Sequence, residues 1–334
     1  MDDLKFGSRN KRGDFTPSER LEIAPYWAWP PNFLKVLKWL PGYIWPWNAF
    51  HMVTALLYWY YVVPDLEVMK TLSWGWALWL YAINAGGIFV MYGAVELFYY
   101  VKRKQATRFK YNARFPADNP SDVFWFKSQN IDNFLRSFFI SIPLWTLVEV
   151  LFLTAFANGW VPWLTWADHP VYLALVALLV PAIHEVHFFL IHRLIHTPFL
   201  YKWVHSVHHN SVNPSPWSSL SMHPVEAFLY HAVAFWHLII PSNPILALFQ
   251  LHSAGFGAIN GHIGFEKLEI TDEATLDSHA YAHYLHHKYF EVNYGADGLI
   301  PLDKWLGYWH DGSPEGEAQM NARFEKKKAR MNAR

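Results

Sequence analysis

Histidine dominates the side chains of this sequence that could do chemistry. The chain contains 19 His, and only two of them precede residue 184. Three clusters stand out, namely His192-x-x-x-His196, His205-x-x-His208-His209 and His283-x-x-His286-His287. Residues three or four apart lie on one face of a helix, so His192 and His196 can point at one ion. In each His-x-x-His-His cluster the three rings fall within an arc of about 100°. One metal ion takes about four to six ligands, and these eight imidazoles therefore predict a centre with two ions.

The imidazole ligands limit which metal ions the site can bind. Neutral imidazole suits iron, copper, nickel or zinc, whereas magnesium and calcium prefer oxygen ligands. The chain has no Cys, which excludes disulfides, thiol catalysis and cysteine-bound zinc or iron–sulfur sites. The isolated histidines are interpreted as ordinary structural residues; they are His51, His169, His231, His237 and His310.

The segments that must position these histidines are unusually apolar. The composition is 53% hydrophobic and 16% charged, and long stretches carry almost no charge. A membrane-spanning helix needs about 20 mainly apolar residues, so the sequence predicts four spans, at 45–64, 73–100, 134–158 and 170–191. The charge-free run 227–265 is broken by Pro241-Ser-Asn-Pro244 and predicts a re-entrant helical hairpin. The expected fold is an all-α integral membrane protein with a helical histidine-box cap. The alternative, buried helices of a large soluble protein, would have to hide four such runs from water.

Basic residues give the orientation. Segment 101–133 is rich in Lys and Arg, while the connections at 65–72 and 159–169 are not. The positive-inside rule places 101–133, the N-terminus and the histidine clusters in the cytosol. We therefore expect a cytosolic segment 1–44, transmembrane helices within 45–170, a catalytic domain at 171–310 and a basic tail at 311–334. The polar first 20 residues predict no cleavable signal peptide.

Together, the three clusters resemble the histidine boxes of the fatty acid hydroxylase/sterol desaturase superfamily. Several flanking features agree with the resemblance, namely Arg193, Lys202, Ser221-Met-His223-Pro-Val-Glu226, Gly261-His262-Ile-Gly264 and Asn293-Tyr-Gly295. The resemblance covers about 180–310 and is strongest to the sterol C5-desaturase-like branch.

This resemblance implies a membrane-bound non-haem di-iron oxidoreductase. Such an enzyme uses O2 and two electrons to desaturate or hydroxylate a C–H bond of a sterol or fatty-acyl lipid. The implied ligands number nine, being His192, His196, His205, His208, His209, His262, His283, His286 and His287. His223 is the first choice for an additional ligand, ahead of His252 and His279. Glu185, two helical turns before His192, is expected to orient a ligand ring as a hydrogen-bond acceptor.

Electrons must come from another protein, because the chain lacks Cys for a cluster and a Gly-x-Gly-x-x-Gly motif for a dinucleotide. A ferredoxin, a rubredoxin or a cytochrome-b5-like carrier is implied. The basic loop and tail are typical topology determinants, and they could also steer an acidic carrier. Lys plus Arg equal Asp plus Glu, at 27 each, so charge indicates no nucleic-acid partner. The absence of Cys and of a terminal dilysine signal favours a bacterial inner membrane over the endoplasmic reticulum.

Three other functions were considered. A metal transporter would place its ligands at mid-membrane, whereas these lie beyond the fourth predicted span. A bis-histidine haem protein needs two or four facing histidines and no repeated boxes. A histidine-rich membrane protein that binds zinc without redox turnover stays open, because imidazole also binds zinc.

Overall fold

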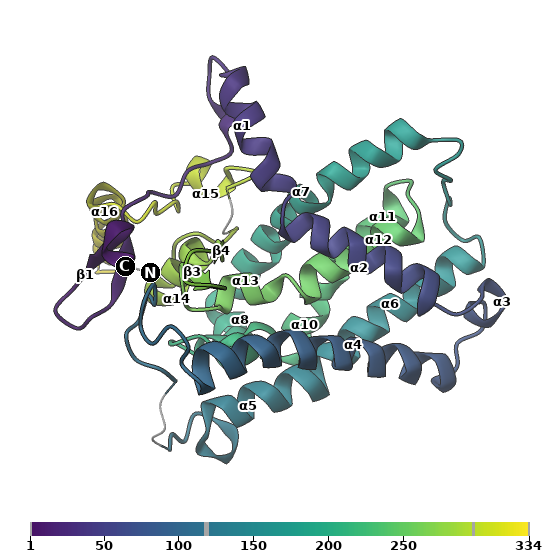
Figure 1. Cartoon of the computed structure of the whole chain (residues 1–334), viewed down its shortest axis with the longest axis horizontal. Helices are drawn as coiled ribbons and strands as arrows, with labels where there is room; N and C mark the ends of the chain where they lie inside the picture. Colours follow the sequence, from purple (N-terminus) through teal and green to yellow (C-terminus); the bar gives the residue numbers. More distant parts are fainter. Residues whose placement is uncertain (1, 117–119, 296–297, 333–334) are drawn as a thin grey trace.

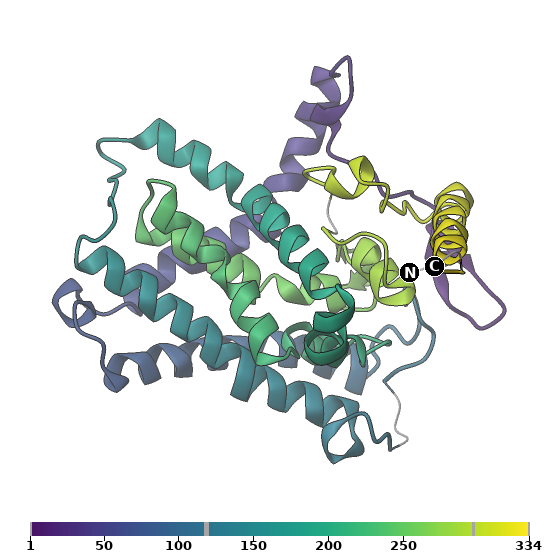
Figure 2. The ribbon, with the colours of Figure 1, turned by 180° about the vertical axis from the view of Figure 1, so that it is seen from behind.

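The chain folds into a long bundle of helices with a compact histidine-bearing cap at one end (Figures 1 and 2). The computed structural model describes residues 2–116, 120–295 and 298–332. Its first half contains α1 (Phe33–Ile44), α2 (Trp47–Tyr61), α3 (Leu66–Met69), α4 (Trp74–Val95), α5 (Gln129–Arg136), α6 (Ile142–Ala157) and α7 (Pro170–Ile195). Its second half contains α8 (Pro198–Leu200), α9 (Ser206–His209), α10 (Pro224–His231), α11 (Trp236–Ile239), α12 (Pro244–Gly255), α13 (Ala258–His262), α14 (Tyr281–Tyr289), α15 (Leu302–Trp305) and α16 (Pro314–Asn332).

Two small antiparallel hairpins complete the cap. They pair β1 (Gly7–Arg9) with β2 (Phe15–Pro17), and β3 (Lys267–Glu269) with β4 (Thr275–Asp277). Short π-helical turns at Glu96–Val101, Ser137–Ser141 and Tyr201–His205 extend or join the α-helices. Short 3-10 turns lie at Asp3–Lys5, Pro25–Trp27, Trp125–Lys127, Pro216–Leu220 and Ala232–Phe235.

Three helices are long and apolar enough to cross a membrane. They cover Trp74–Val101, Gln129–Ala157 and Pro170–Ile195 and match three of the four predicted spans. The first predicted span, 45–64, instead contains α2, which has 15 residues. At 1.5 Å per residue α2 reaches about 22 Å, short of the roughly 30 Å hydrocarbon core. Four spans are therefore not found among the described helices.

The predicted hairpin at 227–265 turns where its prolines indicated. α11 leads into a turn, and α12 returns with nearly all its residues buried against α2, α6 and α7. The turn reaches the connection between α6 and α7, because Leu164 N donates to Ser242 O at 2.8 Å. A re-entrant position in the bilayer stays a prediction.

The N-terminal hairpin is anchored on the cap. Phe15 N donates to Lys110 O at 3.1 Å, and Phe109 N donates to Asp3 Oδ2 at 2.9 Å. Lys110 in turn forms a β-bridge with Phe265, three residues after His262. The N-terminal segment, the start of the basic loop and the region around the histidines therefore lie at one end of the molecule.

Candidate metal centre

All nine histidines implied as ligands lie in two compact groups. The five-histidine group consists of His192, His196, His205, His209 and His286. The four-histidine group consists of His208, His262, His283 and His287. Within each group, one ring nitrogen per residue lies within 4.8 Å of all the others. The two groups adjoin one another, since the ring centroids of His209 and His287 are 4.6 Å apart.

Helical spacing explains how the clusters divide between the groups. In α14, His283 and His287 are four residues apart and enter the four-histidine group together, while His286 points into the other group. The second cluster divides in the same way, with His205 and His209 on one side and His208 on the other. The expected arc of about 100° leaves room for this division, because positions i and i+4 lie about 40° apart on the helix and position i+3 lies about 60–100° from them.

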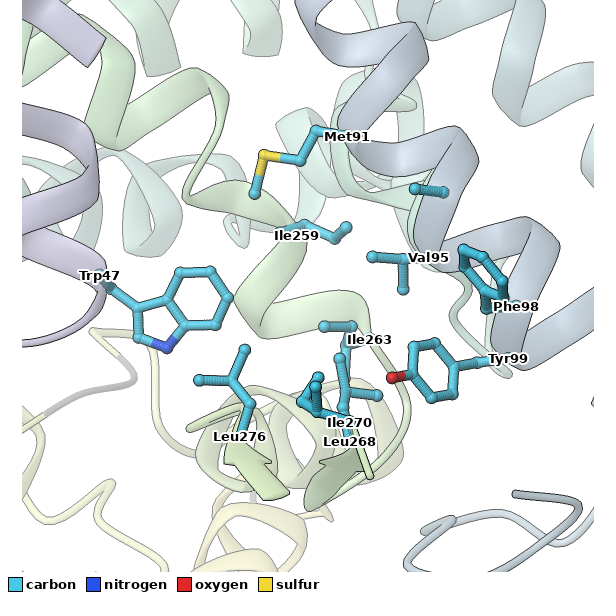
Figure 3. Close-up of a pocket in the computed structure, with 11 residues that line it drawn as sticks. Trp47, Met91, Val95, Phe98, Tyr99, Ile259, Ile263, Leu268, Ile270 and Leu276 are labelled. Atoms are coloured by element: carbon cyan, nitrogen blue, oxygen red, sulfur yellow. The ribbon is translucent and has the colours of Figure 1, made fainter. Parts of the chain in front are cut away.

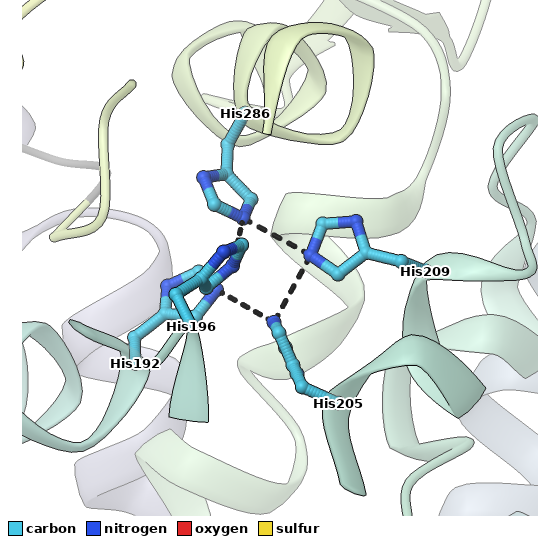
Figure 4. A group of neighbouring side chains, drawn as sticks. All are labelled: His192, His196, His205, His209 and His286. Atoms are coloured by element: carbon cyan, nitrogen blue, oxygen red, sulfur yellow. Dashed lines mark hydrogen bonds between the residues drawn. The ribbon is translucent and has the colours of Figure 1, made fainter. Parts of the chain in front are cut away.

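Ring nitrogens face one another inside both groups, and Figure 4 shows this for the five-histidine group. Nε2 of His205 lies 3.1 Å from Nε2 of His192 and 3.0 Å from Nε2 of His209. Nε2 of His262 lies 3.1 Å from that of His208 and 3.2 Å from that of His283. A metal–nitrogen bond is about 2.1 Å, so neighbouring ligands at right angles would be about 3 Å apart. This geometry fits a metal ion held by imidazoles.

The outer ring nitrogens fix which atom faces inward. Nδ1 of His192 donates to Tyr294 O at 2.8 Å, and Nδ1 of His286 donates to Val292 O at 2.7 Å. A carbonyl oxygen only accepts, so the proton sits on Nδ1 and the Nε2 lone pair faces the group. His208 and His262 are held in the same way by Ser221 O and Ala258 O, at 3.2 and 3.1 Å.

Burial keeps these rings neutral. It lowers the pKa of His208 to about 4 and that of His262 to about 3, with the nearby His208 ring adding to the effect on His262. Burial and neighbouring rings also lower the pKa of His205, His209 and His286 well below the usual value. Neutral imidazole is the form that binds a metal, so the pKa shifts agree with the geometry.

Glu226 is a functional candidate that our sequence reasoning quoted only as part of a motif. Its Oε1 lies 2.7 Å from Nδ1 of His205, and both side chains are buried. Burial raises the pKa of Glu226, and a cation beyond the imidazole would favour the carboxylate. The signal available in the sequence was an acidic residue within a charge-poor stretch, at the start of α10.

Both carboxylate oxygens of Glu185 accept hydrogen bonds from backbone amides. Its Oε1 accepts from Gly298 N at 2.7 Å and its Oε2 from Ile300 N at 2.9 Å. The outer nitrogen of His192, the ring expected to lie on the same helical face, is occupied by Tyr294 O. Glu185 therefore binds the loop that follows Tyr294. A direct hydrogen bond from Glu185 to a ligand ring stays a prediction.

His223 lies outside both groups. Its Nδ1 accepts from Val225 N at 3.2 Å, which makes it the N-cap of α10. The other two candidates for an additional ligand, His252 and His279, are also absent from both groups. Asp303, which sequence reasoning missed, accepts from the amides of Tyr294 and Gly295 at 3.0 and 2.7 Å and so helps hold the carbonyl that orients His192.

An apolar pocket of about 200 Å³ lies beside α13 (Figure 3). Side chains of α4 and its π-helical extension form one wall, and β3, β4 and the residue after β3 form the floor. Ile259 and Ile263 line it on the side of α13, the helix that ends at His262. Trp47, at the start of α2, completes the rim.

Comparison with known proteins agrees with these features. A family model for fatty acid hydroxylase matches residues 177–308. A delta(7)-sterol 5(6)-desaturase from Gibberella zeae is 30% identical over 51% of this chain and 53% of its own length. One from Aspergillus fumigatus is 27% identical over 64% of this chain and 69% of its own length, and a second from that organism is 28% identical over 46% of this chain and 44% of its own length.

The matched region thus spans about half to two thirds of these relatives. No solved structure matches the chain. The relatives named here are fungal, so they give no support to the bacterial inner membrane that the sequence favoured. The matched region contains all nine histidines of the two groups. Over residues 177–308 the chain is therefore similar to the fatty acid hydroxylase family, and about half of the chain is similar to a sterol desaturase.

Proposed function

We propose that this protein is a membrane-bound di-iron oxidoreductase that oxidises a lipid C–H bond with O2. The observation that carries the proposal is the convergence of nine neutral imidazoles into two adjoining groups. The relatives act on sterols, as their names state, so sterol desaturation is the favoured reaction and hydroxylation of a sterol or fatty-acyl chain the alternative.

The reaction balances with an external reductant. In desaturation, a CH2–CH2 unit, one O2, two electrons and two protons give a CH=CH unit and two waters. In hydroxylation, a C–H bond, one O2, two electrons and two protons give C–OH and one water. Two iron ions held by the five- and four-histidine groups would supply the oxidising chemistry with O2.

The chain's own residues have positioning roles in this proposal. The Nε2 atoms of both groups would bind the metals, while backbone carbonyls such as Tyr294 O keep Nδ1 protonated in four of the rings. Glu226 would hold the outer proton of His205 and make that ring a stronger donor. Glu185 and Asp303 fix the loop that carries the Tyr294 carbonyl.

A lipid substrate agrees with the surroundings of the centre. The apolar pocket beside α13 lies at the cap end of α4, and its lining includes Met91, Val95 and Phe98. Part of its wall is exposed, since Phe98 is 45% accessible. We propose that the hydrocarbon part of the substrate enters from the bilayer through this pocket, with a displacement of α13 completing its path to the metals.

Helix α1 supports a membrane location. None of its residues is buried, and it exposes Phe33, Leu37, Leu40 and Ile44 at spacings of three or four residues. Such an apolar stripe is typical of a helix lying in the membrane interface. The cap would then face the cytosol, as the positive-inside rule indicates.

The test compares lipids and metals. Cells that express the protein are analysed by lipid mass spectrometry next to cells that express a variant lacking one ligand from each group, H208A/H286A. A product that has lost two hydrogens indicates desaturation, and one that has gained an oxygen indicates hydroxylation. After anaerobic purification we expect about two irons per wild-type chain. Zinc at full occupancy, with unchanged lipids, would instead favour a zinc-binding protein without turnover.

A further inference from the structure

A basic cleft lies between α16 and the loop that follows the third histidine cluster. Its volume is about 500 Å³, and it is lined by Glu291, Tyr308, Arg323, Lys326, Lys327, Arg330 and Met331. The four basic residues follow one another at spacings of three, one and three, which puts them on one face of α16. Glu291 is the one carboxylate in the lining, and it pairs with Lys327. The lining therefore has three more positive charges than negative ones, from Arg323, Lys326 and Arg330.

Aromatic rings connect the lining of this cleft to the five-histidine group. Tyr308 lines the cleft, and its ring centroid is 5.3 Å from that of Tyr294. The Tyr294 ring lies in turn 5.0 Å from His196 and 5.5 Å from His286. Two aromatic rings therefore connect the wall of the cleft to two of the candidate ligands.

Two arginine side chains lie close to the ring of Tyr308. The guanidinium of Arg193 lies 4.5 Å from the centroid of the Tyr308 ring, and that of Arg323 lies 4.7 Å from it. Arg193 follows the candidate ligand His192 directly in sequence, and its Nη2 also donates to the Tyr308 hydroxyl at 3.3 Å. Positive charge is thus continuous from the exposed face of α16 to the neighbourhood of the histidines.

The position of α16 favours a cytosolic protein over the bilayer as the occupant. Figures 1 and 2 both show α16 at the end of the molecule opposite α3 and the turn between α11 and α12. The three candidate spans run between these ends. A membrane containing them would leave the basic face of α16 in the aqueous phase.

We propose that this cleft is the docking site of an acidic one-electron carrier protein, and that electrons pass from it through Tyr308 and Tyr294 to the five-histidine group. The inference rests on the proposed function, because only a redox enzyme needs the carrier. Two reduced carriers each lose one electron per turnover, and these are the two electrons in the reactions above. The electron-transfer rate falls steeply with distance, so a carrier gains by docking where two rings separate it from the metals. Complementary charge would also speed its association.

The test uses three charge-reversal variants of α16, namely K326E/R330E, K326E and K328E, of which the first two alter the cleft and the third alters another face of the helix. Lys326 and Arg330 are exposed, line the cleft, and have no ion pair or hydrogen bond that holds the fold together in the described residues. The variant K326E/R330E therefore alters the cleft while the Lys327–Glu291 pair remains. The control is K328E, compared with K326E alone, since Lys328 is equally exposed on α16 but does not line the cleft.

Full-length proteins in phosphatidylcholine nanodiscs would be titrated with two probes, the soluble haem domain of cytochrome b5 and an acidic [2Fe–2S] ferredoxin. We expect at least one probe to bind the wild type, with an affinity that falls as salt rises. K326E/R330E should weaken this binding about tenfold, and K328E should leave it within about twofold. Equal effects of K326E and K328E, or no binding of either probe to the wild type, would overturn the proposal.

Two further measurements separate this inference from its premises. Lipid oxidation driven by a small chemical reductant should be the same in K326E/R330E and in the wild type. If the wild type oxidises lipid with the chemical reductant, but K326E/R330E binds the carrier as tightly as the wild type does, the docking site is wrong and the proposed function stands. If no lipid is oxidised with any reductant, the proposed function is wrong. Retained carrier affinity in K326E/R330E, together with lost binding to phosphatidylserine vesicles, would assign the cleft to anionic lipid and refute the carrier.

Discussion

Glu226 Oε1 accepts from Nδ1 of His205 at 2.7 Å, and neither side chain is open to solvent. Four of the other candidate ligands use backbone carbonyls for the same purpose. A carbonyl is neutral, whereas a carboxylate forms a charge-assisted bond that is roughly twice as strong. His205 is therefore expected to be the strongest donor among these rings.

The first prediction follows from this pair. Glu226→Gln keeps the size of the side chain but removes the charge, so the chain should fold and bind iron about 10–100-fold more weakly. Chelator competition on the purified protein measures the affinity. Glu266→Gln is the control. The carboxylate of Glu266 accepts a hydrogen bond from the Tyr111 hydroxyl, and Tyr111 belongs to neither histidine group. Equal iron affinities of the two variants would remove Glu226 from the metal centre.

A second prediction concerns Glu185. Its two oxygens accept from two amides, and Gln offers a single oxygen, so Glu185→Gln should free one amide of Gly298 or Ile300. We expect faster amide exchange at 298–300 and a smaller loss of iron affinity than with Glu226→Gln. Hydrogen-exchange mass spectrometry measures the first effect. A loss of iron with no change in exchange would instead support the direct hydrogen bond to a ligand ring that the sequence predicts.

The spacing of the three clusters was sufficient to find eight of the nine ligand candidates, because that signal is local, whereas His262 was implied by the family resemblance. Spacings of three and four residues fall on one helical face whatever the rest of the chain does. The division of the histidines into two groups could not be predicted from the sequence, because it depends on which neighbouring helix each ring packs against. His286, for example, joins His209, 77 residues away.

Long-range partners also explain what the sequence reasoning missed. Nothing local links Glu226 to His205, or the carbonyl of Tyr294 to His192, which is 102 residues distant. The prediction of four spans is matched for three of them, and the first stays a prediction for a different reason. Hydropathy measures how apolar a stretch is, but the run 45–64 lies beside α12 and forms a helix of 15 residues, too short to cross the core unaided.

The third prediction tests the apolar pocket. Ala94 lines it, so Ala94→Trp should fill part of its roughly 200 Å³ and raise KM for the lipid while iron content is unchanged. Val90→Trp is the control, because Val90 lies on the same helix, is 70% exposed, and does not line the pocket. The measurement is steady-state oxidation of lipid presented in nanodiscs. An unchanged KM in Ala94→Trp would place the substrate path elsewhere.

The fourth prediction concerns acid stability of the metal-free protein. Burial lowers the pKa of His208 to about 4 and of His262 to about 3, against about 6.5 in an unfolded chain. Between these values the unfolded chain binds more protons than the native one, so stability falls as pH drops below about 6.5. Tm of the metal-free protein should therefore decrease from pH 7.5 to pH 5, and by less in H208A than in the wild type. An equal decrease would show that these rings are not buried in the neutral form.

The last prediction is the topology. We expect the cap, the basic loop 101–133 and the C-terminal helix on the cytosolic side, and the connection between α6 and α7 on the other.

Residues 117–119 of that loop, including Asn119, lie outside the described residues, so reporters are better placed at exposed positions that the structure describes. The Cys-free chain allows single reporters, and suitable sites are Lys102, Lys328 and Trp160, all exposed. In sealed, right-side-out vesicles a membrane-impermeant maleimide should label W160C, and K102C and K328C should react only after permeabilisation. Because the histidine groups share the cap with β1, β2 and the start of the basic loop, labelling of K102C and K328C from opposite sides would contradict a cytosolic metal centre.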